Sequence, residues 1–179
     1  MRTRVGYAGG KRRAPTYYKM GDHTETIQID FDPGQITYDE LLAIFWSSHD
    51  PTRQGHVQYR SIVLTEGAAQ AKAVEISRAA IERKLGKTVA TVVAPLGTFT
   101  RAEDYHQKYT LRNWKNVSAD LLRAYPNAQD FTDSTAAARL NGYLAGRGDL
   151  ARLEQDLPRL GLSAEAAAVV RERVQKLNR

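Results

Sequence analysis

One glutamate and two tyrosines are the residues of this sequence best suited to proton transfer and to binding a polar oxygen. Glu25 shares its parity with Ile27 and Ile29 in the alternating segment 25–32, so its carboxyl group is expected on the apolar face of a strand or at the edge of that face. Burial raises the pKa of a carboxyl group, and a protonated Glu25 could donate to a developing oxyanion. A strand that begins one residue later leaves Glu25 in solvent instead.

Tyr17 and Tyr59 each carry a phenol hydroxyl group. Two such groups directed at one polar oxygen would orient a substrate and stabilise negative charge on it. Taken singly, a tyrosine more often serves as an amphipathic packing residue. On the residues alone, both interpretations of each tyrosine stay open.

Other kinds of chemistry find little support in the sequence. The chain contains no cysteine, which excludes a thiolate nucleophile or a disulfide within these 179 residues. We expect no metal site, because no histidine has the short carboxylate or thiolate spacing typical of one. Neither the serines nor the glycines form a nucleophile elbow or a phosphate loop. The residues considered were His23, His49, His56, His106, Ser47, Ser48, Ser61, Gly6, Gly9 and Gly10.

Composition points to one globular domain with a small appendage, since 42% of the residues are hydrophobic and 26% are charged. No stretch is long and apolar enough to span a membrane, and no secretory signal opens the chain, so we expect a soluble cytoplasmic protein with no membrane partner. The formal charge of +6 is spread along the chain, with its densest cluster at Lys11, Arg12 and Arg13. We interpret it as solvated charge and expect no nucleic-acid partner; the nucleic-acid alternative has no support besides charge.

Periodicity and end signals predict strands and helices in mixed order. Thr37 and Glu40 have capping-box spacing before one helix, and Thr100 and Glu103 have it before another. Gly86 is placed to end a third helix. The predicted strands are 5–8, 25–32, 58–64 and 89–93, and the predicted helices are 38–49, 68–85 and one that carries Tyr105, Tyr109 and Trp114.

This order predicts an α+β fold in which a single mixed sheet packs against helices. From about Asp133 onward the composition turns to alanine and leucine at helical spacing, and phenylalanine and tryptophan are lost. We therefore predict a domain over residues 1–132 and a C-terminal helical appendage over residues 133–179.

Several segments, read in order, resemble the methionine sulfoxide reductase A family, and the resemblance covers about residues 3 to 113. No single motif is specific, but their ordered succession is. The matching stretches are Val5-Gly6-Tyr7-Ala8-Gly9-Gly10, Pro15-Thr16-Tyr17, Gly21-Asp22-His23-Thr24-Glu25, Asp32-Pro33, Leu41 through Phe45-Trp46 to His49-Asp50-Pro51, Arg53-Gln54, Gln58-Tyr59-Arg60-Ser61 and Ala102-Glu103-Asp104-Tyr105-His106-Gln107-Lys108-Tyr109.

The resemblance implies a ferredoxin-like α+β fold and reduction of methionine S-sulfoxide, free or in peptides, with no bound cofactor and with thioredoxin as reductant. Reductases of this kind reverse methionine oxidation. By position, Glu25 matches the family's proton donor, and Tyr17 and Tyr59 match the tyrosines that bind the sulfoxide oxygen. In the family a cysteine thiolate attacks the sulfoxide sulfur.

This chain departs from the family where that cysteine belongs. The family's opening strand and its Gly-Cys-Phe-Trp motif have no counterpart before Thr3, and a family aspartate cannot be assigned in the short passage Gly55–Gln58. A resolving cysteine is also absent. Two explanations stay open: the sequence begins inside a longer protein that carries the cysteine, which we favour, or the chain is a non-catalytic module that binds oxidised methionine or a partner peptide. Without cysteine, the 179 residues alone are expected to be inactive.

Overall fold

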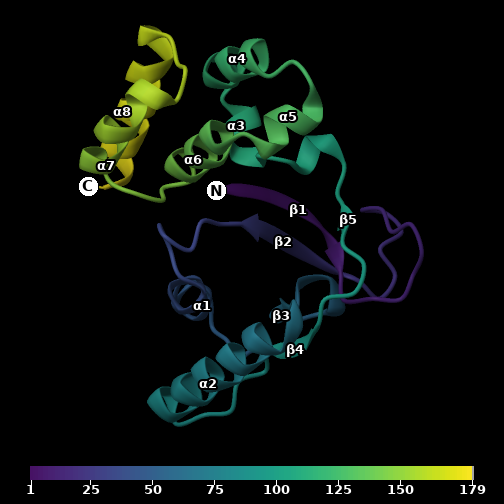
Figure 1. Cartoon of the computed structure of the whole chain (residues 1–179). Helices are drawn as coiled ribbons and strands as arrows, with labels where there is room; N and C mark the ends of the chain where they lie inside the picture. Colours follow the sequence, from purple (N-terminus) through teal and green to yellow (C-terminus); the bar gives the residue numbers. More distant parts are fainter. Residues whose placement is uncertain (179) are drawn as a thin grey trace. The chain divides into compact units, whose positions relative to one another are not determined.

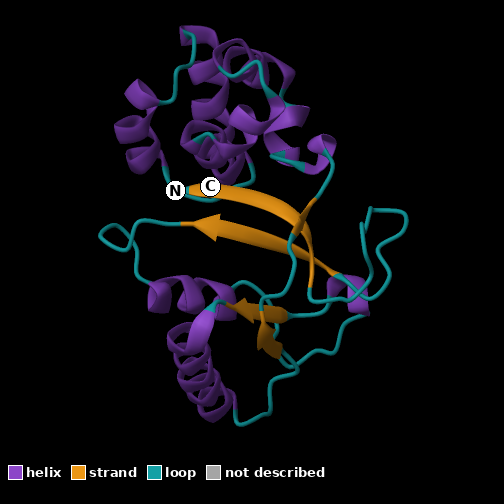
Figure 2. Cartoon of the chain, turned by 45° about the vertical axis from the view of Figure 1, so that its right-hand side comes forward, coloured by secondary structure: helices purple, strands orange, loops and turns teal. Residues whose placement is uncertain are grey.

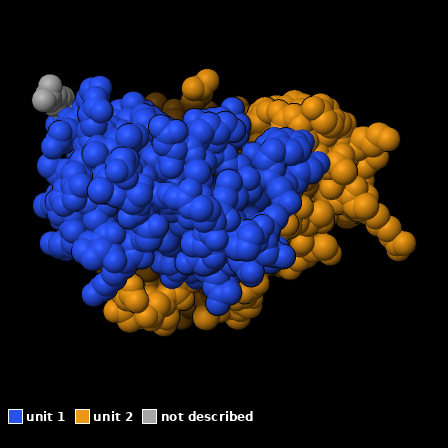
Figure 3. Space-filling model, turned by 90° about the horizontal axis from the view of Figure 1, so that it is seen from above, with its two compact units in different colours: residues 1–4, 28–30, 103–179 blue, residues 5–27, 31–102 orange. Residues whose placement is uncertain are grey.

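The structure is a computed structural model that describes residues 1–178. The chain divides into two compact units, which are coloured separately in Figure 3. Unit 1 consists of Met1–Arg4, Gln28–Asp30 and the chain from Glu103 onward, and unit 2 consists of Val5–Ile27 and Phe31–Ala102. Residues 103–132 therefore belong to the same compact unit as residues 133–178. The boundary of the family domain at residue 133 stays a prediction.

A three-stranded sheet has the order β2–β1–β5, where β1 is Arg2–Ala8, β2 is Thr24–Asp30 and β5 is Thr100–Arg101. Strands β1 and β5 are antiparallel, with Tyr7 opposite Thr100. A small core lies beside this sheet in unit 2, where Tyr7, Met20 and Ala102 are buried and Val5 and Tyr17 pack against them. Strand β2 is thus at an edge of its sheet (Figure 1).

A second sheet in unit 2 contains only β3, Ile62–Thr65, and β4, Val92–Pro95. The two strands are parallel and are joined by α2, Gly67–Leu85, as the crossover between parallel strands requires. The helix α1, Tyr38–Ser47, packs beside α2, and their shared core contains Leu42, Trp46, Val74 and Val89. Figure 2 shows the two sheets as separate groups of arrows.

Unit 1 is mostly helical. Its helices enclose one continuous core, which includes Leu111, Phe131, Leu140 and Val170. Side-chain caps begin several of these helices, as where the Ser163 hydroxyl accepts a hydrogen bond from Ala166 N. The helices are α3, Tyr109–Asn113; α4, Lys115–Ala124; α5, Ala128–Asp133; α6, Thr135–Leu144; α7, Leu150–Asp156; and α8, Ala164–Leu177.

The α+β class is confirmed, although the described strands form two sheets where a single mixed sheet was expected. The capping box at Thr37 and Glu40 is confirmed, and so is the left-handed cap at Gly86. The strand expected over 58–64 begins only at Ile62, because residues 57–59 form the 3₁₀ turn η1, Val57–Tyr59. The strand expected over 89–93 is β4, shifted toward the C-terminus.

The second predicted capping box, at Thr100 and Glu103, is wrong. Thr100 pairs with Tyr7 in β5, and Glu103 precedes the 3₁₀ turn η2, Asp104–His106, without a side-chain cap. Pairing with β1 has overridden the local helix signal. None of the helices within residues 1–178 combines the length and apolar character needed to cross a membrane.

Candidate active site

Tyr17 lies on the loop between β1 and β2, residues 9–23, which we call the basic loop. His23, only 2% exposed, holds this loop together: its Nδ1 accepts a hydrogen bond from Gly10 N at 3.3 Å, and its Nε2 contacts Arg12 O at 2.8 Å. A carbonyl oxygen can only accept, so Nε2 is the donor to Arg12 O. A side chain at position 10 does not fit, because a Cβ there would lie 2.6 Å from Asp22 Oδ1.

The Asp22 carboxylate fastens the same loop. It accepts hydrogen bonds from Lys11 N at 2.8 Å and Arg12 N at 3.1 Å, and these bonds lower its pKa below the ordinary aspartate value. A tight turn between Thr16 and Lys19 then presents Tyr17, whose ring also packs against the core around Tyr7. The basic loop is therefore a fixed support for the Tyr17 hydroxyl.

The structure brings the three predicted side chains together. Tyr59 is 64% exposed, and its pKa is raised by the desolvation that remains, by the nearby Tyr17 and Glu25 and by a side-chain hydrogen bond with Tyr17. Two phenols and one carboxyl group thus converge within unit 2. Such a group of donors could hold a polar oxygen and supply it with a proton. The role of each residue in catalysis stays a prediction.

Of the two environments left open for Glu25, buried or in solvent, the described residues have the solvated one, although β2 begins before Glu25 and not after it. The Glu25 side chain is exposed, and Ile27 on the same face of β2 is 58% exposed. On the opposite face Thr24 is only 1% exposed, because its hydroxyl donates to Val57 O at 2.8 Å and accepts from Arg60 Nε at 2.8 Å. Alternation correctly separated the two faces, but the covered face is the polar one.

Three residues missed as site candidates support the cluster. Gln58 Nε2 donates to Glu25 Oε1 at 2.8 Å, and Gln58 precedes Tyr59 in η1. Thr24 and Arg60 fix that turn to the beginning of β2. All three lie within matched family stretches, which was the available signal. Gln58 and Glu25 are 33 positions apart in the sequence, so their hydrogen bond could be found only from the folded structure.

A serine and a histidine also meet in unit 2. His49 Nε2 lies 2.7 Å from Ser61 Oγ, and Ser61 Oγ lies 2.8 Å from Thr91 Oγ1. The other nitrogen, His49 Nδ1, faces the Phe45 carbonyl oxygen at 3.0 Å and has no carboxylate to orient it. Ser61 also precedes β3 and does not sit on a strand-to-helix elbow. We interpret the group as a polar link between the end of α1 and the β3–β4 sheet.

Residues 1–178 contain no group of three or more histidine, aspartate or glutamate side chains placed to bind a metal ion. The sequence has no cysteine that could act as a nucleophile. What the site offers is therefore a carboxyl group, two phenols and the amide of Gln58, which suit binding and proton transfer.

Comparisons with known proteins agree on one family. A family model described as peptide methionine sulfoxide reductase matches residues 1–139. The chain is 38% identical over 169 residues to the peptide methionine sulfoxide reductase of Drosophila melanogaster, covering 91% of this chain and 66% of that protein. It is 40% identical over 152 residues to peptide methionine sulfoxide reductase A5 of Oryza sativa subsp. japonica, covering 81% of this chain and 59% of the relative.

Solved structures give a similar result. The reduced form of Mxr1 from Saccharomyces cerevisiae is 30% identical with a TM-score of 0.59, and the match covers 63% of this chain and 71% of that one. Methionine sulfoxide reductase A of Corynebacterium diphtheriae is 34% identical with a TM-score of 0.53, covering 62% of this chain and 63% of that one. The chain spans only 66% and 59% of the length of the two curated relatives above.

Proposed function

The chain belongs to the peptide methionine sulfoxide reductase family, and from this premise we propose that it provides the substrate-binding and proton-donating part of a reductase of methionine S-sulfoxide, free or in peptides. The observation that carries the proposal is the convergence of Tyr17, Tyr59 and Glu25. The two phenols bind the sulfoxide oxygen, and Glu25 supplies its proton. Gln58 holds one carboxyl oxygen of Glu25 and leaves the other free to carry the proton.

The nucleophile in this proposal is a cysteine outside the 179 residues. Its thiolate attacks the sulfoxide sulfur, the sulfur–oxygen bond breaks, and the oxygen ends on the cysteine as a sulfenic acid while methionine leaves. Two electrons pass from the cysteine sulfur to the methionine sulfur. A dithiol reductant of the thioredoxin class then converts the sulfenic acid to thiol and water and becomes a disulfide.

Two open surfaces support the proposal that a further segment completes the site. Strand β2 is an edge strand, and both strands of the β3–β4 sheet have a free side. Ile27 in β2 and Ile44 in α1 are 58% and 56% exposed. An added strand would pair with free backbone groups and cover apolar side chains of this kind. The same cover would desolvate Glu25, which favours the protonated acid that the reaction needs.

A second candidate function is a non-catalytic module that binds oxidised methionine or a partner peptide. The observation in its favour is that the tyrosines and Glu25 converge in a chain that has no cysteine. Its binding groups are the same as in the first proposal. The two proposals differ only in whether a thiol is brought to the bound sulfoxide.

The deciding experiment extends the reading frame upstream of Met1 and tests the longest product for reduction of a methionine S-sulfoxide peptide, with dithiothreitol as reductant and mass spectrometry to detect methionine. An in-frame cysteine, activity that is lost with that cysteine, and slower reduction in Glu25→Gln are the expected results. If no cysteine is encoded, the reductase proposal is wrong, and titration of the 179-residue chain with the same peptide tests the binding module. An unchanged rate in Glu25→Gln would reject the proton-donor role.

A further inference from the structure

The basic loop has a charge composition that its structural role does not require. It contains four cationic side chains and one acidic residue, Asp22. The four cations are all exposed and are Lys11, Arg12, Arg13 and Lys19. The Asp22 carboxylate accepts hydrogen bonds from backbone amides of the loop and pairs with none of the four side chains. The loop therefore carries an excess of positive charge beside the candidate site.

These cations differ from five described arginines of unit 1 that have acidic partners. Arg4 pairs with Asp30 and Asp133, and Arg139 pairs with Asp156. Within residues 1–178, no ion pair involves a side chain of the basic loop. Exposed cations of α2 such as Lys72, Arg83 and Lys84 have no ion pair within the described chain either. What distinguishes the loop is that four such cations gather within nine residues, where an external anion can be accommodated.

The backbone that carries these cations is held in a defined position. Buried His23 joins Gly10 to Arg12, and Pro15 and Met20 are also buried, so both halves of the loop are fixed to unit 2. Cations on a fixed backbone lose less backbone entropy on binding a partner than cations on a free chain do. This distinguishes the loop from a solvated run of charge.

Two cations, Lys19 and Arg60, also lie next to the tyrosines proposed to bind the sulfoxide. Lys19 closes the same turn as Tyr17, and the ends of such a turn are less than ~7 Å apart. Arg60 follows Tyr59 and donates only to the neutral oxygens of Thr24 and Gly9. A peptide in extended conformation advances roughly 3.4 Å per residue, so side chains within about two positions of the oxidised methionine can reach these cations.

We propose that the basic loop and Arg60 bind acidic side chains that flank the oxidised methionine, so that the preferred substrates are acidic peptide segments. The inference rests on the proposed function, because it places the sulfoxide at Tyr17, Glu25 and Tyr59. Aspartate or glutamate next to the methionine sulfoxide contributes Coulomb attraction at short range. Exposed pairs of this kind are weak singly and are screened by salt, so two of them together give a preference of about five- to tenfold.

The test measures binding of four peptides to the purified 179-residue chain by calorimetric titration. One pair of peptides contains methionine sulfoxide between two aspartates or between two asparagines, and the other pair contains methionine in the same two contexts. Titrations are run at about 0.02 M and about 0.3 M salt, where the Debye length falls from roughly 20 Å to less than 10 Å. The sulfoxide comparison tests the proposed function, and the aspartate comparison tests the inference.

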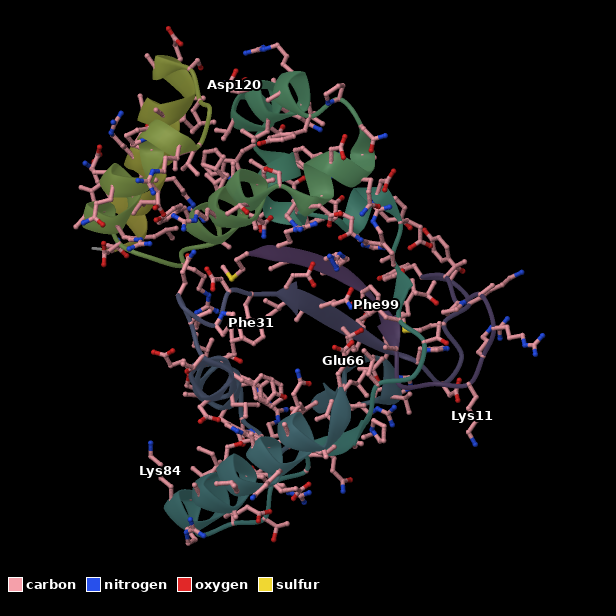
Figure 4. All side chains as sticks on the ribbon, viewed as in Figure 1. Lys11, Phe31, Glu66, Lys84, Phe99 and Asp120 are labelled. Carbon is pink, nitrogen blue, oxygen red and sulfur yellow. The ribbon has the colours of Figure 1, made fainter. Side chains whose placement is uncertain are left out.

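Matched variants separate local charge from net charge. The loop variant is Lys11→Gln, Arg13→Gln and Lys19→Gln; Arg12 is kept because its side chain packs against Gly21. The control variant is Lys72→Gln, Arg83→Gln and Lys84→Gln, three exposed cations of α2 with the same residue types. Lys11 and Lys84 lie at opposite sides of unit 2 (Figure 4). Both variants lose the same charge.

We expect the aspartate-flanked sulfoxide peptide to bind about five- to tenfold more tightly than the asparagine-flanked one at low salt. High salt and the loop variant should reduce this preference to less than about twofold, and the control variant should keep it. Equal affinities for the aspartate and asparagine peptides at low salt, with the sulfoxide still preferred over methionine, would overturn the inference and leave the proposed function standing.

The other outcomes are equally decisive. A preference for aspartate with equal binding of methionine and its sulfoxide would contradict the proposed function and not the acidic-segment site. Absence of binding by all four peptides would overturn both. If a short DNA duplex loses affinity in the loop variant while the peptides do not discriminate, the loop binds nucleic acid and the inference is wrong.

Discussion

The helical unit 1 and the sheet-containing unit 2 differ in how fully they bury their apolar side chains and pair their charged ones. Unit 1 encloses a single core around Leu140 and Phe131, and its buried aspartates, Asp120 and Asp156, have hydrogen-bond partners. Unit 2 has two smaller cores, exposes Ile27 and leaves the basic loop without ion pairs. The apolar core is therefore enclosed in unit 1, where no ligand is proposed, and unit 2 is open where substrate and a further strand are proposed to bind.

The largest expected effect comes from the core of unit 1. Leu140 is fully buried in α6, so Leu140→Ala removes apolar contacts and leaves a cavity. We expect a loss of about 2–5 kcal/mol in the free energy of unfolding. Urea denaturation followed by circular dichroism measures it. The matched control is Leu122→Ala in α4, where the side chain is 40% exposed and the loss should stay below about 1 kcal/mol. Equal losses would mean that the enclosed core of unit 1 is not as described.

The part of the fold that could be predicted from sequence is the part set by local chemistry. Thr37 and Glu40 form the capping box that their spacing indicates, because each side chain bonds to the other residue's backbone amide within one turn. Thr100 and Glu103 have the same spacing and form no cap, since Thr100 is drawn into pairing with β1. Capping-box spacing therefore predicts a helix start unless a segment far along the chain forms hydrogen bonds with the same backbone groups.

The candidate site shows the same limit. The family resemblance assigned Tyr17, Glu25 and Tyr59 to one site. In the structure the two tyrosines are joined by a side-chain hydrogen bond, and Glu25 is near enough to raise the pKa of Tyr59. The alternation of β2 correctly assigned Glu25 and Ile27 to one face of the strand, but it did not predict which face is covered by other residues. That depends on neighbours far along the chain: η1 covers Thr24, whereas no described element covers Ile27. The Gln58 contact was unpredictable for the same reason.

A buried charge network gives the second-largest expected effect. Asp156 accepts a hydrogen bond from Tyr143 at 2.7 Å and another from Arg139. Burial by itself raises the pKa of Asp156, but these hydrogen bonds outweigh burial and leave the pKa below the ordinary value. Burial and the carboxylate raise the pKa of Tyr143 to about 12. Asp156→Asn removes the charge that both partners face, so we expect a loss of about 1.5–3 kcal/mol at pH 7.

The pH dependence of that loss follows from the sign of the shift. A lowered folded-state pKa stabilises the protein fully above the unfolded carboxyl value, near 3.9, and the stabilisation is lost as pH falls through the folded value. The difference between the unaltered chain and Asp156→Asn should therefore be constant from about pH 5 to 7 and shrink below about pH 4. Urea denaturation at each pH measures it. A difference that grew in acid would contradict the assigned hydrogen bonds.

A smaller effect is expected where unit 2 fixes its site. Thr24→Val keeps the shape of the side chain and removes the hydroxyl that donates to Val57 O and accepts from Arg60 Nε. We expect a loss of about 1–2 kcal/mol, because both partners then lack a hydrogen bond. Thr26→Val is the control, since Thr26 Oγ1 lies 3.4 Å from Gly6 O and should contribute less than about 0.5 kcal/mol. A similar loss in both variants, measured by urea denaturation, would show that β-strand propensity and not the clamp on η1 decides stability here.

The smallest expected effect sharpens the contrast between a stable scaffold and an open site. Gln58→Leu removes the amide that holds Glu25 Oε1, and the side chain lies at the surface of unit 2, so the free energy of unfolding should change by less than about 0.5 kcal/mol. Binding of a methionine sulfoxide peptide should nevertheless weaken by about three- to tenfold, because Glu25 is no longer held toward the tyrosines. Gln54→Leu, an exposed glutamine in the segment before η1, should leave both quantities unchanged. If Gln58→Leu lowered stability and left the affinity as it was, Gln58 would belong to the scaffold, and the separation between a satisfied fold and an unsatisfied site would not extend to the residues around Glu25.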